Sequence, residues 1–365
     1  MANGFAPYVL KDLFTLSGQN YAGLKITQNG FLGMLLENSN VVDAKLTNQQ
    51  GHQKTAKVKY KTRQTTSTVV EEDNCDIDFT PVYKEADMTA VRFAKTGFHL
   101  SMETVSKYME SASSRVALGG TTVLEEIANS IQHTADSIVT KINQRLLGDV
   151  TWGINVVTGV NTAGTINIAK NPALNLADGV SKILSDAFEN NFSGNLLIVG
   201  NGLMNSYELS KGLTGLNNAG LDVSKFNGYK FYADLMSKTA SGWGANKIGV
   251  FSPGSIHFVD FQKYVGFQRG QLGNSFFGQI DLNVSNGMTV VPMTFDIQIK
   301  ELDCPTTLLN GYGEEGTYDR GYAVFLSKRY GLFQTPSDAF ASDDTLSGVN
   351  GALRYTVTNT CDECA

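Results

Sequence analysis

A long helical pattern at residues 121–147 constrains the fold of this chain more than any other feature. The run contains neither Pro nor Gly before Gly148, and Thr122 and Glu125 have the spacing of an N-terminal capping box. About 26 residues rising ~1.5 Å each give a rod of roughly 39 Å. Apolar residues recur every three or four positions, and they are Leu124, Ile127, Ile131, Ala135, Ile138, Ile142 and Leu146. The pattern predicts an amphipathic helix with one buried face.

A charged segment that precedes this helix alternates with the period of a β-strand. Four basic residues occupy every second position, and acidic residues follow them after a short interval. With a turn near residues 67–68, a hairpin would place Lys59 opposite Asp76. A turn at residues 72–74 is the competing register. The charged residues in question are Lys57, Lys59, Lys61, Arg63, Glu71, Glu72, Asp76 and Asp78.

These eight residues are the candidate contact residues of the chain. A charged hairpin is often only an exposed, soluble feature, and each cross-strand pair contributes only ~0.2–1 kcal/mol. The alternative is a projecting hairpin that lies across a neighbouring subunit, where its charges set register and choice of partner. An isolated two-stranded ribbon is only marginally stable in water. In the second interpretation, packing against the neighbouring subunit stabilises it.

The remaining segments predict an α+β protein. Helical spacing occurs at residues 31–36, at 178–192 and, after a buried strand at 195–199, at 200–212. Strand patterns occur at residues 88–100, 152–168, 228–235, 247–261, 290–302 and 322–333, and Ser101 is placed to cap a short helix.

Motifs that carry chemistry are weak in this chain. Gly200 and Gly202 follow a strand, as in a dinucleotide-binding turn, but the third glycine position is Asn205. Asp222 lies at a suitable distance to hold a ribose, yet it sits in a Gly/Asn-rich loop. The four His are not spaced as metal ligands. We therefore predict no catalytic, cofactor-binding or metal-binding residues and no cofactor.

The four cysteines are few and scattered. Cys361 and Cys364 form half of a zinc site or a redox pair at the end of the chain. Reduced thiols in a terminal tail are the simpler interpretation, and a metal or disulfide link to Cys75 or Cys304 is the alternative.

Charge and hydropathy exclude several classes of protein. The net charge of −6 argues against a general nucleic-acid binder with a basic face. No apolar run reaches the ~18 residues of a membrane span, and the N-terminal residues do not resemble a secretion signal. We expect no membrane association.

The order of these patterns resembles the major capsid protein of tailed bacteriophages, the Hong Kong 97-type fold. The resemblance covers about three quarters of the chain and rests on pattern and order. Its strongest part is a strand, a Ser-capped short helix and a long helix that closes on Leu-Leu-Gly. The matching segments are residues 91–94, 101–105, 146–148, 196–205, 228–232, 248–261, 322–330 and 338–340.

The resemblance implies a role for each part of the chain. Residues 1–42 would form an N-terminal arm and residues 43–86 an elongated β-hairpin loop. A peripheral domain with the long spine helix would comprise residues 87–158 and 290–328. An axial α/β domain with the C-terminal tail would comprise residues 159–289 and 329–365.

The implied function is structural. Hexamers and pentamers of the chain would build the icosahedral head of a virion around double-stranded DNA held without sequence-specific binding. The shell would assemble in the host cell cytoplasm with a separate scaffolding protein, a portal protein and in some cases decoration proteins. The family's Lys–Asn cross-link maps onto no motif here. The alternatives are a nucleotide- or cofactor-binding α/β enzyme and another virion structural protein.

Overall fold

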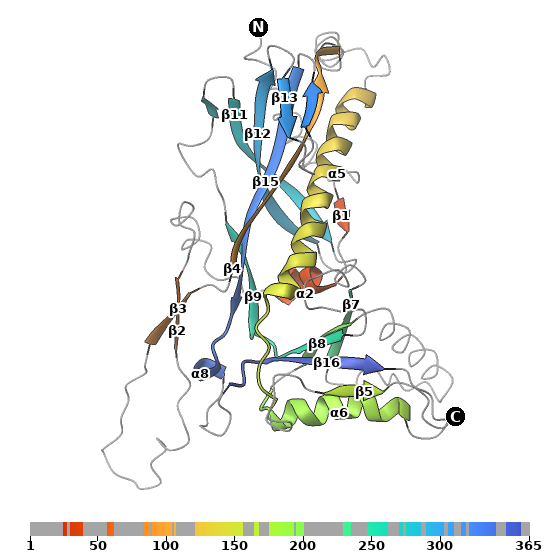
Figure 1. The fold of residues 1–365 in the computed structure, drawn as a ribbon, viewed down its shortest axis with the longest axis vertical. Coiled ribbons are helices and arrows are strands. Elements are labelled where there is room, and N and C mark those ends of the chain that lie inside the picture. Colours follow the sequence, from red (N-terminus) through yellow and green to blue (C-terminus); the bar gives the residue numbers. More distant parts are fainter. Residues whose placement is uncertain are drawn as a thin grey trace.

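The computed structural model shows an α+β chain built around two separate β-sheets (Figure 1). Two further two-stranded ribbons, β2–β3 and β13–β14, complete the described strands. The structure describes residues 25–27, 30–38, 57–61, 83–87, 90–103, 106, 121–155, 164–167, 175–192, 195–200, 229–234, 247–261, 270–272, 275–285, 290–302, 306–309, 315–318, 321–340 and 348–358.

The larger sheet has 7 strands, with the order β1-β11-β12-β15-β4. Strand β10 adds to β11, and β9 adds to β15. Strands β11, β12, β15 and β4 pair antiparallel with one another in that order and form the long twisted body of Figure 1, whereas β1 pairs with β11 in parallel. The bounds are β1 (Lys25–Thr27), β4 (Ala90–Ser101), β9 (Ile256–Phe261), β10 (Gly270–Leu272), β11 (Ser275–Ser285), β12 (Val290–Leu302) and β15 (Gly321–Gln334).

Helix α5 (Thr121–Leu146) lies alongside this sheet and confirms the long helix expected from the sequence. Its apolar stripe is buried at every described position, and a 3-10 turn at Leu147–Asp149 ends it. The side chains of Leu124 and of the expected cap, Thr122 and Glu125, lie outside the described residues. The sheet and the helix share one apolar core, so most of the stabilisation of α5 comes from burial rather than from local propensity.

The smaller sheet has 5 strands in the order β5-β16-β8-β6-β7 and carries α6 (Asn175–Glu189) beside it (Figure 1). Strand β6 is buried along its whole length, as its unbroken apolar sequence predicts. Residues of this sheet and of α6 form a second apolar cluster. The strands are β5 (Thr165–Asn167), β6 (Leu196–Gly200), β7 (Tyr229–Ala233), β8 (Lys247–Phe251) and β16 (Ala352–Thr358).

Most expected elements match the structure closely. Strand β12 has the predicted bounds, and β15 extends the predicted strand by one residue at each end. Strand β4 runs through Ser101, and Met102 and Glu103 after it are helical. Of the strand material expected at 152–168, only β5 is a described strand, with a single bridge residue at Asn155. The helix expected at 200–212, with Asn205, lies outside the described residues beyond Gly200, as does Asp222.

Two described segments bear on the expected division into parts, which stays a prediction. Helix α2 (Phe31–Asn38) lies in the expected N-terminal arm, and its Phe31 and Leu32 are fully buried in the larger core. Strand β11 lies in the expected axial domain and pairs along its whole length with β12. Both segments carry apolar residues that are buried in this core, and this burial stabilises their positions.

Helix α2 is held by polar side chains from distant segments. The backbone N–H of Phe31 donates to Asp234 Oδ2 at 2.9 Å, and the N–H of Leu32 donates to Asn143 Oδ1 at 2.8 Å. Asn143 Nδ2 also donates to Asp234 Oδ2 at 3.2 Å. These bonds satisfy free donors of the first helical turn and join α2, α5 and the end of β7.

Within the described residues, no helix is both long enough and apolar enough to cross a membrane.

Replacing Gly30 with Ala should destabilise the chain at this helix start. Gly30 has φ +115°, and an added Cβ would lie 2.7 Å from the carboxylate of Asp234. The strained backbone costs about 1–3 kcal/mol, and displacement of Asp234 adds to that cost. Gly254→Ala is the matched control, because Gly254 has φ +77° with no atom within 4 Å. Urea unfolding should show the larger loss for Gly30→Ala, and equal losses would contradict the role of Asp234.

Candidate functional site

The charged hairpin begins as an antiparallel ribbon of β2 (Lys57–Lys61) and β3 (Tyr83–Asp87). Lys59 lies opposite Glu85, with 3.8 Å between Nζ and Oε1, and Lys57 lies opposite Asp87. The expected pairing of Lys59 with Asp76 is therefore wrong. The turn of the hairpin, and with it the competing turn at residues 72–74, lies outside the described residues.

The structure describes only part of the predicted contact set. Lys57, Lys59 and Lys61 lie on β2, and of these only the side chain of Lys59 is described. The Lys59–Glu85 pair is exposed, with 78% and 48% of the side chains accessible, so it contributes little to folding. The remaining predicted residues lie outside the described ones, and they are Arg63, Glu71, Glu72, Asp76 and Asp78.

A cluster around Asp338 fixes the base of this hairpin to the body of the protein. Asp338 belongs to the short helix α8 (Ser337–Phe340) and accepts hydrogen bonds from both strands of the ribbon. The Tyr60 hydroxyl lies 3.0 Å and 3.2 Å from its two carboxylate oxygens, and Lys84 Nζ lies 2.7 Å from Oδ2. We call these three residues the Asp338 cluster.

The cluster stabilises the ionised form of Asp338. Partial burial works to raise the pKa of Asp338, but hydrogen bonds from Lys84 and Tyr60 together with the Lys84 charge hold it below its ordinary value. The hydrogen bond to Asp338, followed by its charge, raises the pKa of Lys84. The depressed Asp338 pKa gives stability that is lost as pH falls through the folded-state value. The raised Lys84 pKa gives stability that is lost as pH rises through its own folded-state value. The cluster is strongest between these limits.

Sequence reasoning missed all three residues of the Asp338 cluster. Lys84 belongs to the segment at 83–87, where Glu85 and Asp87 occupy alternate positions, and these acids could have marked β3 as the partner of the basic strand β2. Asp338 lies 278 residues from Tyr60, and no local pattern connects them.

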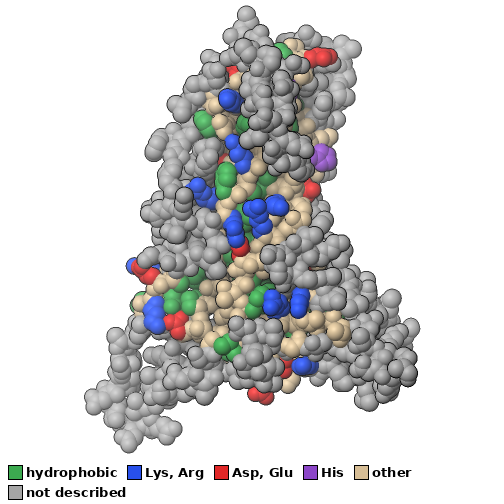
Figure 2. Space-filling view, viewed as in Figure 1, with side chains coloured by type: hydrophobic (Ala, Val, Ile, Leu, Met, Phe, Trp, Pro, Cys, Tyr) green, Lys and Arg blue, Asp and Glu red, His purple; other side chains and the backbone are tan. Residues whose placement is uncertain are grey.

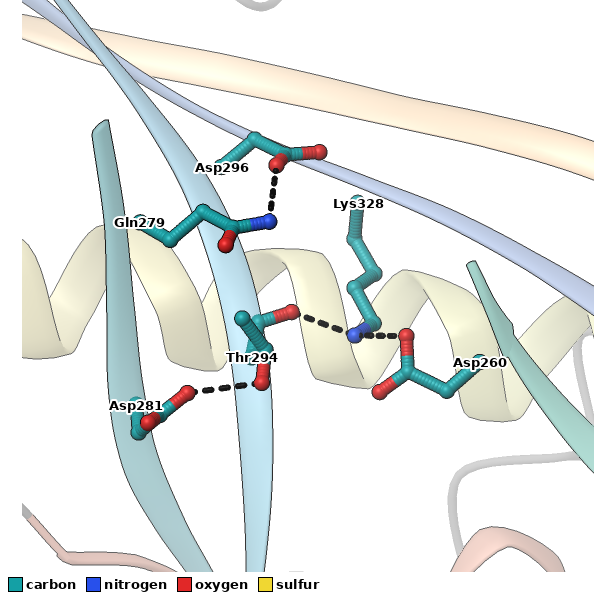
Figure 3. A network of polar contacts seen from close by, with 6 residues as sticks. All are labelled: Asp260, Gln279, Asp281, Thr294, Asp296 and Lys328. Carbon is teal, nitrogen blue, oxygen red and sulfur yellow. Dashed lines mark hydrogen bonds and ion pairs between the residues drawn. The ribbon is translucent and has the colours of Figure 1, made fainter. Parts of the chain in front are cut away.

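A second polar cluster lies where three strands meet at Lys328 (Figure 3). Strand β12 pairs with β15 as far as Ser327, and β9 pairs with β15 from Arg329 onward. Lys328 lies between the two ladders, and its ammonium donates to Asp260 Oδ1 on β9 and to the backbone oxygen of Thr294 on β12. We call this the strand junction. The lysine thus bridges two strands that pair with neighbouring parts of the same strand.

The strand junction holds a buried charge inside an apolar core. Only 1% of the Lys328 side chain is accessible, against 36% for Asp260, and the Phe295 ring lies 5.6 Å from Nζ. Burial raises the pKa of Asp260, and the Lys328 charge and hydrogen bond oppose this effect. Asp281 and Asp296 lie nearby and are held separately, Asp281 by the Thr294 hydroxyl at 2.6 Å and Asp296 by Gln279 at 3.1 Å (Figure 3). These contacts fix geometry and place no nucleophile beside a base.

The part of the chain that the structure describes contains no group of three or more side chains arranged to hold a metal ion. All four cysteines lie outside it, as do His52 and Gly202 of the Gly-x-Gly turn. The prediction of no cofactor stays a prediction.

Comparisons with known proteins give only structural neighbours. No family model and no curated protein matches the chain. A solved structure titled Mycobacterium phage Cain is 11% identical, with 92% of each chain covered and a TM-score of 0.49. The Cyanophage A-1(L) capsid asymmetric unit is 13% identical, covering 89% of this chain and 92% of its own, with a TM-score of 0.44. The capsid of Myoviridae Phage XM1 is 12% identical, covering 91% and 94%, with a TM-score of 0.42.

These similar structures come from bacteriophages.

Asp338→Asn should loosen the hairpin base without unfolding the protein. The amide removes the charge that binds Lys84 and weakens the acceptor for Tyr60. Hydrogen exchange of residues 57–61 and 83–87 should become several-fold faster while exchange in β15 stays unchanged. Glu85→Gln is the control, because its pair with Lys59 is exposed. Faster exchange in Glu85→Gln but not in Asp338→Asn would show that the Lys59–Glu85 pair, and not the Asp338 cluster, holds the ribbon in place.

At the strand junction, Asp260→Ala should cost more stability than Lys328→Met. The first change leaves a buried ammonium without its main counterion, which costs about 3–5 kcal/mol. The second leaves a partly exposed carboxylate and one backbone carbonyl without a donor, which costs about 1–3 kcal/mol. Asp281→Asn, at an exposed position, should change stability by less than about 0.5 kcal/mol. Unfolding midpoints in urea would rank the three variants, and the opposite order for the first two would refute a buried charge at Lys328.

Proposed function

We propose that this chain is the major capsid protein of a tailed bacteriophage, with a Hong Kong 97-type fold. The observation that carries the proposal is that the chain combines a packed body with a charged ribbon that is attached to it through one polar cluster. The long sheet and α5 form that body. The β2–β3 ribbon lies apart from both sheets in Figure 1 and is joined to α8 through the Asp338 cluster. A shell subunit needs both parts, because a stiff plate sets curvature and a projecting element reaches a neighbour.

The described elements support a division into the parts expected from the sequence. The larger sheet with α5 corresponds to the peripheral domain with its spine helix, and the smaller sheet with α6 corresponds to the axial domain. Residues 43–86 are the elongated loop, and its predicted charged residues are the contacts with neighbouring subunits. In this proposal α2 anchors the N-terminal arm in the core, and β9, β10 and β11 extend the peripheral domain beyond the boundaries drawn from the sequence.

Assembly would depend on many weak contacts. One exposed ion pair contributes little, but a hexamer or pentamer repeats each contact around its axis, and a closed shell repeats it over every subunit. Alternating charges also discourage incorrect registers, because like charges would then face one another. The chain would serve in the virion after assembly in the host cytoplasm, beside separate scaffolding, portal and possible decoration proteins.

Purified protein should form closed shells or sheets of hexamers, visible by negative-stain electron microscopy and as large particles in light scattering. Deleting residues 65–74 should leave a folded protein that no longer assembles, because the tip of the hairpin would be missing. A chain that stays a small uniform oligomer, even with a phage scaffolding protein supplied, would refute the proposal. Unchanged assembly after the deletion would refute the role of the hairpin alone.

A further inference from the structure

Strand β1 and helix α2 together span the joint between the two sheets. Strand β1 pairs in parallel with β11 at the edge of the larger sheet, with Lys25 opposite Asn283 and Thr27 opposite Ser285. Helix α2 follows shortly after β1 in the chain and lies between α5 and the smaller sheet in Figure 1. We call these two elements the strap. One end of the strap is part of the larger sheet, and the other end reaches the smaller one.

Both ends of α2 are fastened to β7 of the smaller sheet. At the N-terminal end, Asp234, directly after β7, accepts the hydrogen bond from the N–H of Phe31. At the C-terminal end, Glu37 accepts a hydrogen bond from the Tyr232 hydroxyl at 2.9 Å and forms an ion pair with Lys230. Partial burial works to lower the pKa of Lys230, but hydrogen bonds to Glu37 and Tyr232 raise it overall. Two carboxylate contacts, one at each end, thus hold α2 on β7.

The strap also supplies apolar side chains to the joint. Four apolar residues of α2 are buried in a core that they share with α5 and with residues of the smaller sheet. The ring of Phe31 lies 5.4 Å from the ring of Phe251 on β8. Withdrawal of α2 would remove these contacts and leave apolar surface of both sheets without a partner. The four residues are Phe31, Leu32, Met34 and Leu35.

Three other segments pass from one sheet to the other, and they are bound to one another. They follow α5, connect β8 with β9, and follow β15. The Gln334 amide exchanges hydrogen bonds with the backbone of Thr151 at 2.9 Å and 2.7 Å, and Asn350 donates to the same carbonyl at 2.8 Å. The N–H of Ser252 donates to the carbonyl of Gly351 at 2.8 Å. We call these five residues the crossing cluster, and the strap contacts named above involve none of them.

We propose that the strap fixes the angle between the two sheets, and that the crossing cluster is the hinge about which the smaller sheet turns when the strap is released. The strap is short, with three residues in β1 and eight in α2. Its release would break only an edge pairing and would leave the ladders within both sheets intact. The crossing segments are covalently continuous with strands of both sheets, so they stay at the joint and can serve as the hinge.

This inference goes beyond the proposed function and does not depend on it. In the proposed shell, subunits around five-fold and six-fold axes would meet at different angles. A joint held by one releasable strap would accommodate that difference without repacking either sheet.

The test measures the distance between two spin labels by double electron–electron resonance. The labels replace the exposed Lys182 on α6 and Lys300 on β12 through non-natural amino acids, so the native cysteines remain, and labelled chain is diluted with unlabelled chain. The variant Glu37→Gln/Asp234→Asn removes both carboxylate charges from the strap contacts. It should widen the distance distribution about twofold. Amides of α2 and β7 should exchange about tenfold faster, with β4 and β15 unchanged.

The matched control is Glu85→Gln/Asp338→Asn, which makes the same two changes from acid to amide at the β2–β3 ribbon. Figure 2 shows acidic and basic side chains next to one another over this ribbon and α8, at the lower left of the view. The control should leave the distance distribution and the exchange of α2 and β7 unchanged. The single variant Glu37→Gln is milder, and it should widen the distribution by a smaller amount.

Each outcome decides the inference. Faster exchange in α2 with an unchanged distance distribution would overturn it, because other contacts would then set the angle. Equal widening in the control, or no faster exchange in α2, would overturn it as well. Faster exchange in β4 and β15 would show that the double variant has unfolded, and Glu37→Gln would then decide by the same criteria. Because the labels report on single subunits, a failure to form shells would refute the proposed function and leave this inference standing.

Discussion

Strand β15 is the constraint on which the rest of the structure depends. It pairs with β4 along one edge and, along the other, with β12 and then with β9. Its residues are almost all buried, so its register fixes what lies against both faces of the sheet. On this second edge, the ladder with β12 ends at Ser327 and the ladder with β9 begins at Arg329, so Lys328 is paired in neither. Its ammonium instead binds Asp260 on β9 and the Thr294 carbonyl on β12, so the buried charge has partners on both strands.

The two sheets are not continuous. They are joined by the larger apolar core, which includes Leu197, Val199 and Phe251 of the smaller sheet, and by a few buried polar contacts. Asp234 follows the end of β7 in the smaller sheet and binds the first turn of α2. Asn143 on α5 binds both of them. Buried hydrogen bonds of this kind contribute only ~1 kcal/mol each, but leaving a partner unsatisfied costs more. They therefore specify one arrangement of the helix and the sheets more than they increase stability.

Contacts that are few and individually weak are also compatible with the proposed shell. A subunit that must fit slightly different surroundings needs a stiff core and attachments that are individually weak. The Asp338 cluster lies at the base of the charged ribbon and is partly exposed to solvent. This cluster is a surface feature of the described body.

The sequence by itself determined the elements whose periodicity is long or whose apolar run is unbroken. The pattern from Leu124 to Leu146 predicted α5, and the alternation at 290–302 predicted β12, because burial of one face requires that spacing. The sequence also indicated that Lys59 lies in a charged strand. Only the tertiary structure decided that Lys59 faces Glu85, that Asp338 holds Tyr60 and Lys84, and that Lys328 bridges β9 and β12. The contacts of Asp338 and Lys328 join residues far apart in the chain, and their partners are selected by strand register and packing, which local spacing does not record.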